Sequence, residues 1–210
     1  MKETSYIPQA TINRLPAYYR YLMSLDAAGL TRVSSGEIAK AVQVDSATIR
    51  RDFSYFGALG KRGYGYEVQS LLTFLTKILN QDKLTKVALI GLGNLGNALL
   101  NYQFHKSNNT RIAVAFDVKE EVVDTIQAGV PVYHIDKLVQ QLELLKIEIA
   151  ILTVPGDQAQ AVTDQLVASG IKGILNFSPV PLVTPEKVRV QNVNLTHELQ
   201  TLIYFLDLYQ

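Results

Sequence analysis

The stretch Gly91-Leu92-Gly93-Asn94-Leu95-Gly96 decides the fold of the second part of this chain. It follows an apolar run, Lys86–Ile90, and it opens a segment with helical periodicity. A second apolar run, Arg111–Phe116, ends at Asp117, which lies 21 residues beyond the last glycine. A strand, a glycine loop, a helix and a second strand ending in an acidic residue form the fingerprint of a dinucleotide-binding unit.

Each residue type in this fingerprint has a chemical reason. Gly91 permits a tight turn, Gly93 lets the backbone approach a pyrophosphate, and Gly96 lets the helix pack closely on the strand. The start of the helix offers free N–H groups to the diphosphate. We expect Asp117 to accept hydrogen bonds from the adenosine ribose and to repel a 2′-phosphate, which favours NAD(H) over NADP(H). The alternative is that Asp117 only closes a turn at the end of its strand.

Strand and helix patterns continue to alternate after this unit. Apolar runs at 130–135, 147–154 and 171–176 predict strands, and 158–168 predicts a helix. We therefore expect a Rossmann-type, doubly wound α/β domain over 81–194. Ligands of such sheets lie beyond the carboxyl ends of the strands. The residues predicted there, on the nicotinamide side, are Thr153, Val154, Pro155 and Asn176; ordinary strand-to-loop turns are the alternative.

The first 80 residues predict a winged-helix domain with a helix-turn-helix. Periodic apolar residues, from Ile12 to Leu25, predict a helix over about 13–28 with Pro16 in its first turn. Ser34 and Glu37 have the spacing of a capping box before a second helix. Residues 43–45 form a polar turn, and Asp45 or Ser46 can cap a third helix over 46–56.

The third helix has the division expected of a recognition helix. Ile49, Phe53 and Phe56 share one face, which would pack on the core. The remaining faces carry donors suited to base edges and phosphates. The residues of this helix predicted to contact DNA are Ser46, Thr48, Arg50, Arg51, Ser54 and Tyr55.

Residues 57–66 are rich in glycine and predict a hairpin wing. Lys61, Arg62 and Tyr64 lie in it and are expected to contact DNA phosphates or the minor groove. An amphipathic helix from Val68 to Leu79 would close the domain. The alternative is that the winged helix is a protein-interaction or dimerisation fold and that Arg50 and Arg51 form a solvated face.

The charge distribution agrees with a polyanion-binding first domain. Residues 1–80 contain ten Lys/Arg and six Asp/Glu, net +4, whereas residues 81–210 contain ten and thirteen, net −3. The chain has 48% hydrophobic residues, no cysteine, no apolar run of membrane-spanning length and no apolar signal segment. These properties exclude disulfides and thiolate chemistry, and they lead us to expect a cytoplasmic protein.

Two features bear on whether the chain is an enzyme or a regulator. Of the three histidines, His105, His134 and His197, neither of the first two lies in a recognisable catalytic motif. The nucleotide fold also leaves no substrate domain, so we expect no enzyme. An NAD-dependent dehydrogenase remains the weaker alternative. The segment 195–210 is helical and strongly apolar, so it must be covered by its own domain or by a second subunit.

The residues assembled so far occur in a characteristic order. The most specific segments are Arg14–Leu22, Thr48–Gly57, Arg62–Tyr66, Gly91–Gly96, Leu175–Pro179 and Leu199–Phe205. Together they resemble the Rex family of bacterial redox-sensing transcriptional repressors over nearly the whole chain. The resemblance implies a homodimer that binds a palindromic operator similar to TTGTGA…TCACAA and is released when NADH binds, so that it senses the NADH/NAD⁺ ratio.

The resemblance also implies roles for three further residues. Tyr102, on the helix after the glycines, matches a family tyrosine near the nicotinamide. Arg20 matches an arginine of the inter-domain switch, and Asn194 stands where some members have an aspartate that pairs with it. The helix 195–210 would be exchanged between subunits. A DNA-binding regulator that senses another nucleotide, such as coenzyme A, is the alternative.

Overall fold

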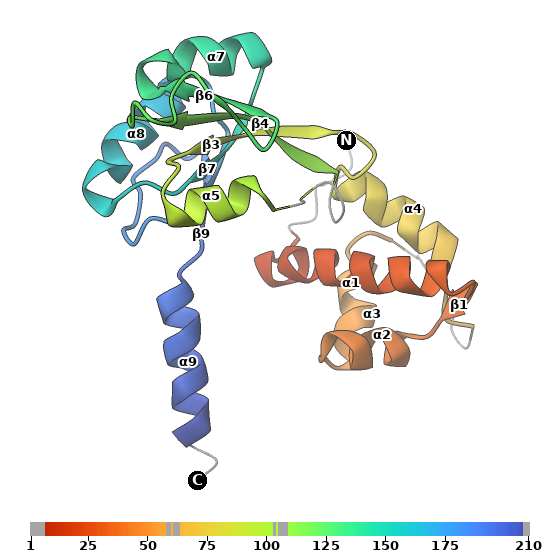
Figure 1. Ribbon diagram of the computed structural model, residues 1–210. Helices are drawn as coiled ribbons and strands as arrows, with labels where there is room; N and C mark the ends of the chain where they lie inside the picture. The colour runs from red at the N-terminus through yellow and green to blue at the C-terminus, as the bar shows by residue number, and fades with distance from the viewer. Residues whose placement is uncertain (1–6, 58–59, 61–63, 103, 105–108, 208–210) are drawn as a thin grey trace. The chain divides into compact units, whose positions relative to one another are not determined.

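The protein is described here from a computed structural model that covers residues 7–57, 60, 64–102, 104 and 109–207. The chain divides into two compact units, 1–83 and 84–210 (Figure 1). The division lies three residues beyond the boundary expected at position 80.

Helices dominate the described part of the amino-terminal unit. Its elements are α1 (Gln9–Ala27), β1 (Arg32–Val33), α2 (Ser35–Val42), α3 (Ser46–Ser54), β2 (Tyr66–Glu67) and α4 (Val68–Ile78). The two short strands pair antiparallel, with Val33 opposite Tyr66. One apolar cluster joins α1, α2, α3 and α4, and Tyr18, Phe53 and Tyr66 stack edge to face within it. This order of elements confirms the predicted helix-turn-helix.

The first helix differs from its prediction in its start and at one position of its buried face. It begins at Gln9, so Pro16 lies inside the helix and not in its first turn. The buried positions include Thr11 and Tyr18, whereas Ile12 is 43% exposed. Of the residues in the predicted pattern, Leu15 and Leu22 are buried, and Tyr19 and Leu25 pack against the same core. The prediction was wrong only at Ile12, because the buried position of the first turn is Thr11, a polar residue that an apolar pattern does not include.

The helix-turn-helix has the predicted capping box. The Ser34 hydroxyl accepts from the Glu37 amide at 3.1 Å, and the Glu37 carboxylate accepts from the Ser34 amide at 2.7 Å. These contacts lower the pKa of the Glu37 carboxyl, chiefly through the hydrogen bonds from Ser34. Asp45 precedes α3, but its side chain makes no capping hydrogen bond. The helix ends at Ser54, two residues before the predicted end.

The wing is described only in part, so the hairpin over 57–66 stays a prediction. Tyr66, its last residue, pairs with β1, which precedes α2. Gly65 has φ +71°, and a Cβ there would lie 2.5 Å from the Val33 carbonyl oxygen. The close approach of the chain to β1 at this point therefore requires glycine. Lys61 and Arg62, predicted to contact DNA, lie outside the described residues.

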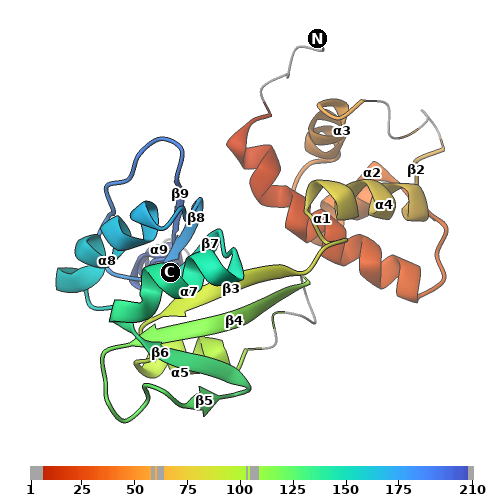
Figure 2. The same cartoon turned by 90° about the horizontal axis from the view of Figure 1, so that it is seen from above.

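The second unit is built on a sheet with the strand order β5-β6-β4-β3-β7-β8-β9 (Figure 2). All neighbours are parallel except β5, which pairs antiparallel with β6. The strands are β3 (Thr85–Ile90), β4 (Thr110–Asp117), β5 (Ile126–Gln127), β6 (Val130–His134), β7 (Ile149–Leu152), β8 (Gly173–Asn176) and β9 (Arg189–Asn192). Without the edge strand β5, this is the 3-2-1-4-5-6 order of the doubly wound dinucleotide-binding fold.

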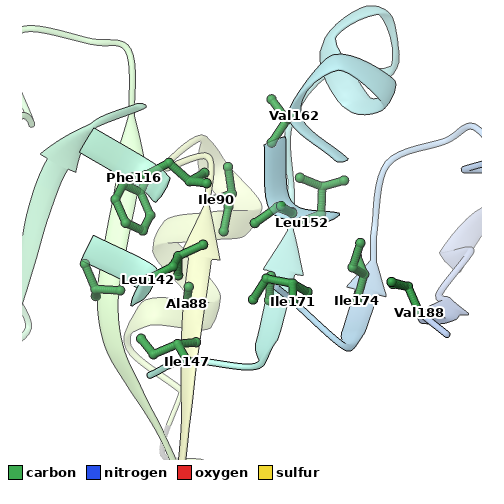
Figure 3. Close-up of a cluster of buried hydrophobic side chains, with 14 of the residues drawn as sticks. Ala88, Ile90, Phe116, Leu142, Ile147, Leu152, Val162, Ile171, Ile174 and Val188 are labelled. Carbon is green, nitrogen blue, oxygen red and sulfur yellow. The ribbon is translucent and has the colours of Figure 1, made fainter. Parts of the chain in front are cut away.

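Helices cover both faces of this sheet. They are α5 (Asn94–Leu100), the short 3-10 helix η1 (Ile135–Lys137), α7 (Leu138–Leu145) and α8 (Gly156–Ala168). A further helix, α9 (Leu195–Asp207), follows β9, and its large apolar residues are exposed. Because side chains alternate along a strand, Ala88 and Ile90 face the core under α7 and α8 (Figure 3), whereas Val87 and Leu89 face the core under α5. The predicted α/β fold class is thereby confirmed. None of the helices in the described part of the chain is long and apolar enough to cross a membrane.

Candidate nucleotide site and nucleic-acid interface

The glycine loop lies where β3 ends, next to the end of β7. Gly91 has φ +94°, and a Cβ there would lie 3.0 Å from the Thr153 carbonyl oxygen. A Cβ at Gly96 would lie 1.9 Å from the Gly91 carbonyl oxygen. The fold itself therefore requires glycine at both positions, as the fingerprint predicts for the turn and for the packing of α5.

Gly93 differs from these two glycines. Its φ of −68° is accessible to any residue, and a Cβ there would meet no atom within 4 Å. The fold does not explain glycine at this position. A diphosphate needs open space beside unpaired backbone N–H groups, which the start of a helix provides. Of the other loop residues, Leu92 is buried, Asn94 is exposed and Leu95 is half-buried.

Asp117, the predicted ribose ligand, has a contact that the sequence did not reveal. Its carboxylate accepts from the amide of Leu92, within the glycine loop, and from the amides of Val118 and Lys119 at 2.8 and 2.9 Å. The residue is 8% exposed. A carboxylate has about four acceptor positions, so one remains for a ligand. Asp117 therefore joins the end of β4 to the glycine loop, in addition to closing its own turn.

The end of β7 is tied to the same loop. The Thr153 hydroxyl lies 2.9 Å from the carbonyl oxygen of Ile90 and 2.7 Å from that of Gly91, and it can donate to either. Val154 and Pro155 follow, and Pro155 precedes α8. Strands β3 and β7 are neighbours whose crossovers run in opposite directions along the sheet, which is the point where such sheets bind ligands.

Asn176, predicted on the nicotinamide side, is 1% exposed and already engaged. Its amide nitrogen donates to the Val180 carbonyl and to the Asn192 side chain, and its oxygen accepts from the Ser178 amide. The side chain thereby fixes the loop after β8 to β9. The structure gives it a clear role in positioning this loop; contact with a nicotinamide remains a prediction.

Tyr102 does not lie on the helix where the sequence placed it. Helix α5 ends at Leu100, and Tyr102 lies in the turn that follows, 59% exposed, with its ring 4.7 Å from that of Phe104. The early end of α5, after seven residues, removed it from the helix. A cavity of about 290 Å³ adjoins it, lined also by Thr110 and Val130 at the amino ends of β4 and β6. Within one chain, Tyr102 is therefore at the opposite end of the strands from the glycine loop.

The exposed face of α3 carries the predicted DNA-contacting residues. Arg51 and Ser54 are exposed, whereas Ser46, Thr48 and Tyr55 are half-buried. The Ser54 hydroxyl donates to the Arg51 carbonyl at 2.6 Å, and the guanidinium of Arg51 makes no hydrogen bond to another described residue. An exposed arginine on a helix of this type is suited to base edges in the major groove.

Arg50 is held in place by two serines. Its Nη1 lies 3.2 Å from the hydroxyl of Ser35, in the first turn of α2, and 3.3 Å from that of Ser46, in the first turn of α3. The predicted pair of arginines thus divides into one that is free and one that is anchored. Tyr64 is 71% exposed, and the Arg32 guanidinium lies 5.9 Å from its ring centre, so these two residues form a basic and aromatic corner beside β1.

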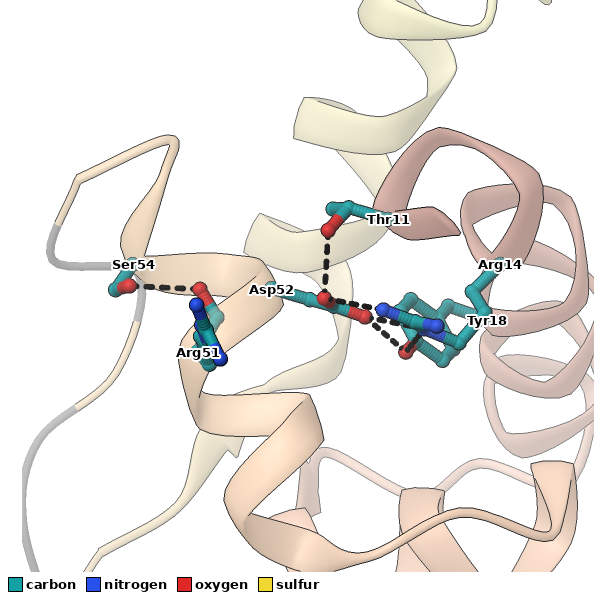
Figure 4. A network of polar contacts seen from close by, with 6 residues as sticks. All are labelled: Thr11, Arg14, Tyr18, Arg51, Asp52 and Ser54. Carbon is teal, nitrogen blue, oxygen red and sulfur yellow. Dashed lines mark hydrogen bonds and ion pairs between the residues drawn. The ribbon is translucent and has the colours of Figure 1, made fainter. Parts of the chain in front are cut away.

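A buried carboxylate on α3 is the main feature that the sequence analysis missed. Asp52 is 1% exposed and accepts from three residues of α1: Thr11 at 2.8 Å, Tyr18, and Arg14 through Nε and Nη2, each at 2.7 Å (Figure 4). Burial alone would raise the pKa of the Asp52 carboxyl, but the hydrogen bonds from Arg14, Tyr18 and Thr11 lower it overall. Burial and the bond to Asp52 raise the pKa of the Tyr18 hydroxyl. Only the segments Arg14–Leu22 and Thr48–Gly57, singled out by the resemblance, pointed to it.

Helix α9 is exposed along its length. Its large apolar residues are 50–63% exposed, and they are Leu195, Leu199, Leu202, Ile203, Tyr204, Phe205 and Leu206. The side-chain oxygen of Asn194 accepts from the His197 amide at 3.0 Å and caps this helix. An aspartate at this position could cap it equally. Arg20 is exposed on α1.

Nowhere in the described ranges do three or more His, Asp or Glu side chains gather as metal ligands would. His134 Nδ1 lies 3.0 Å from the Asp136 carboxylate at the surface, and His105 lies outside the described residues.

Comparison with known proteins agrees with both halves of this description. Residues 6–54 match a family described as "Putative DNA-binding protein N-terminus", and residues 82–180 match one described as "CoA binding domain". A redox-sensing transcriptional repressor Rex of Ligilactobacillus salivarius is 65% identical over 96% of this chain and 94% of its own length. One of Levilactobacillus brevis is 66% identical over 97% and 96%. The chain belongs to the Rex family of redox-sensing transcriptional repressors.

Solved Rex structures are similar over the same length. A crystal structure of the protein RSP in complex with β-NAD⁺ and operator DNA is 39% identical, with a TM-score of 0.90 over 97% of this chain and 94% of that one. A structure of RSP with β-NADH is 36% identical, with a TM-score of 0.85 over 97% and 95%. As a Rex-family member, the chain is a regulator and not an enzyme, although it has the sheet of a dehydrogenase.

Proposed function

We propose that this protein represses transcription as a homodimer on a palindromic operator and leaves the DNA when it binds NADH. The observation that carries the proposal is Gly93, where open space adjoins a glycine that the fold does not need. The basic recognition helix in the other unit would bind the operator. The high identity to named Rex repressors over almost the whole chain supports the same conclusion.

The nucleotide site would work through backbone donors and one carboxylate. When bound, the dinucleotide supplies a nicotinamide whose charge differs between NAD⁺ and NADH. The amides of the glycine loop are suited to donate to its diphosphate, and Asp117 has an acceptor position left for the adenosine ribose. Its negative charge disfavours a 2′-phosphate, so NAD(H) is favoured over NADP(H).

The dimer proposal depends on α9. Seven large apolar side chains, each at least half exposed, cannot remain in water on a stable soluble protein. A second copy of the chain is the occupant that the Rex resemblance implies, and two linked winged helices would then read the two halves of a palindrome. A DNA-bound regulator with this composition belongs in the cytoplasm, which completes the proposal.

The response to NADH needs two states of different affinity. NADH shifts the protein off DNA only by as much as it binds the released state more tightly. Arg20 and Asn194 are the proposed switch residues, and Tyr102 is the proposed contact to the nicotinamide. The Asn194 side chain retains a hydrogen-bond acceptor but lacks the charge of an aspartate, so we expect the direction of the response to persist and its size to differ.

Calorimetric titration, followed by operator binding, tests this proposal. The protein is titrated with NADH, NAD⁺, NADPH and coenzyme A, and a fluorescent duplex containing TTGTGA…TCACAA is then displaced by each ligand. We expect binding of NADH and NAD⁺, and release of DNA by NADH. Coenzyme A is the second candidate because residues 82–180 match a family described as a CoA binding domain. Release of DNA by coenzyme A and not by NADH would select it.

A further inference from the structure

The outer edge of the Arg14 guanidinium has no role in the fold. A guanidinium carries five N–H groups. Asp52 and Tyr18 engage Nε and one N–H of Nη2, and Nη1 makes no hydrogen bond to another described residue. The Arg14 side chain is 28% exposed, whereas that of Asp52 is 2% exposed. The inner edge is therefore buried against the carboxylate, and the outer edge reaches solvent.

Arg14 and Arg50 lie on opposite sides of the α3 face that carries Arg51. Successive residues of a helix are separated by about 100°, so residues 50 and 52 lie on either side of Arg51. Arg50 is anchored to Ser35 and Ser46 on one side. Asp52 holds Arg14 on the other side, and Figure 4 shows this pair and Arg51 on different sides of the helix.

This arrangement matches the shape of a DNA groove. A major groove is about 12 Å wide and is bounded by a phosphate backbone on each side. A helix that reads bases with its central residue brings its flanking residues toward the two backbones. We infer that Arg14 binds the DNA backbone, with the outer edge of its guanidinium donating to one phosphate group in each half-site.

Asp52 is then a positioning residue. A buried ion pair contributes little to stability, because desolvation offsets the attraction, and apolar residues of similar size often serve as well. A bidentate carboxylate does fix the plane of a guanidinium. Asp52 thus orients the fork of Arg14 before DNA arrives, while Thr11 and Tyr18 occupy the remaining acceptor positions of the carboxylate.

This inference rests on the proposed function. It is tested by replacing single phosphates of the operator with neutral analogues. Duplexes carrying a single methylphosphonate at each position of the half-site are titrated with the parent protein and with Arg14→Gln/Asp52→Asn. This double variant keeps a donor facing an acceptor and leaves the net charge unchanged. We expect one position per half-site at which the substitution weakens the parent about tenfold or more and leaves the double variant unaffected.

Two further variants keep the test decisive. Lys77→Gln, on the exposed side of α4, removes a charge and should respond to every methylphosphonate as the parent does. If the double variant fails to fold, Arg14→Lys retains the ion pair but lacks the second edge of a planar fork, and should lose sensitivity at the same position. Equal responses of parent and variants at every phosphate would overturn the inference. Absence of operator binding by the parent would instead contradict the proposed function.

Discussion

Replacing Gly93 by valine should separate ligand binding from folding. The backbone there has φ −68° and ψ −169°, and a Cβ would meet no atom within 4 Å, so the variant should fold. The expected cost is the poorer capping of α5, about 0.5–1 kcal/mol, which lowers Tm by roughly 1–4 °C in a protein of this size.

The effect on NADH should be far larger. The valine methyl groups would occupy the space where the diphosphate must approach the loop amides. Hydrogen bonds to a charged group are worth about 1.5–3 kcal/mol each, so losing two of them weakens binding by more than a hundredfold. Calorimetry should find no NADH binding, and fluorescence anisotropy should find normal operator affinity that NADH no longer reduces.

Gly96→Ala is the contrasting variant. Its Cβ would lie 1.9 Å from the Gly91 carbonyl oxygen, so it should fail by unfolding and not by loss of ligand alone. A folded Gly93→Val protein that bound NADH with unchanged affinity would refute the assignment of the glycine loop to the diphosphate.

Three further predictions concern other parts of the chain. Arg51→Ala should leave Tm unchanged and weaken operator binding by roughly 1–3 kcal/mol, and unchanged affinity would remove α3 from the interface. Deleting 195–210 should abolish the dimer in analytical ultracentrifugation and sharply reduce binding to the palindrome; a truncated dimer with full affinity would contradict the role of α9. Because the pKa of Asp52 is lowered in the folded state, its contribution to stability is present above about pH 4 and is lost as pH falls through the folded value. The free energy of unfolding, measured in urea between pH 7 and pH 3, should therefore fall more steeply below pH 4 in the parent than in Asp52→Asn.

The sequence predicted the elements of the fold where a local cause is strong. The capping box of α2 and the glycine turn after β3 depend on neighbouring residues, and both are present as expected. The apolar runs of the central strands were found because a parallel sheet buries both faces. Short strands with exposed residues, such as β5 and β9, lack that signature and were not predicted.

The residues that the sequence missed depend on long-range contacts. Asp52 is joined to residues 34 to 41 positions away, and no local pattern distinguishes it from a solvated aspartate. The contact of Asp117 with the Leu92 amide likewise spans 25 residues. Tyr102 was expected on the helix after the glycines, as the resemblance implied, but α5 ends two residues earlier.

Because of the exposed apolar surface of α9, the stability of this protein should depend on its concentration. If a second copy covers the helix, the mass-action law applies to folding itself, and the melting temperature should rise with protein concentration. A newly made chain would then bury the apolar surface of α9 only after it binds a second chain. Mixed dimers with a subunit unable to bind DNA would form readily, so a defective copy of the gene should act dominantly over an intact one in the same cell.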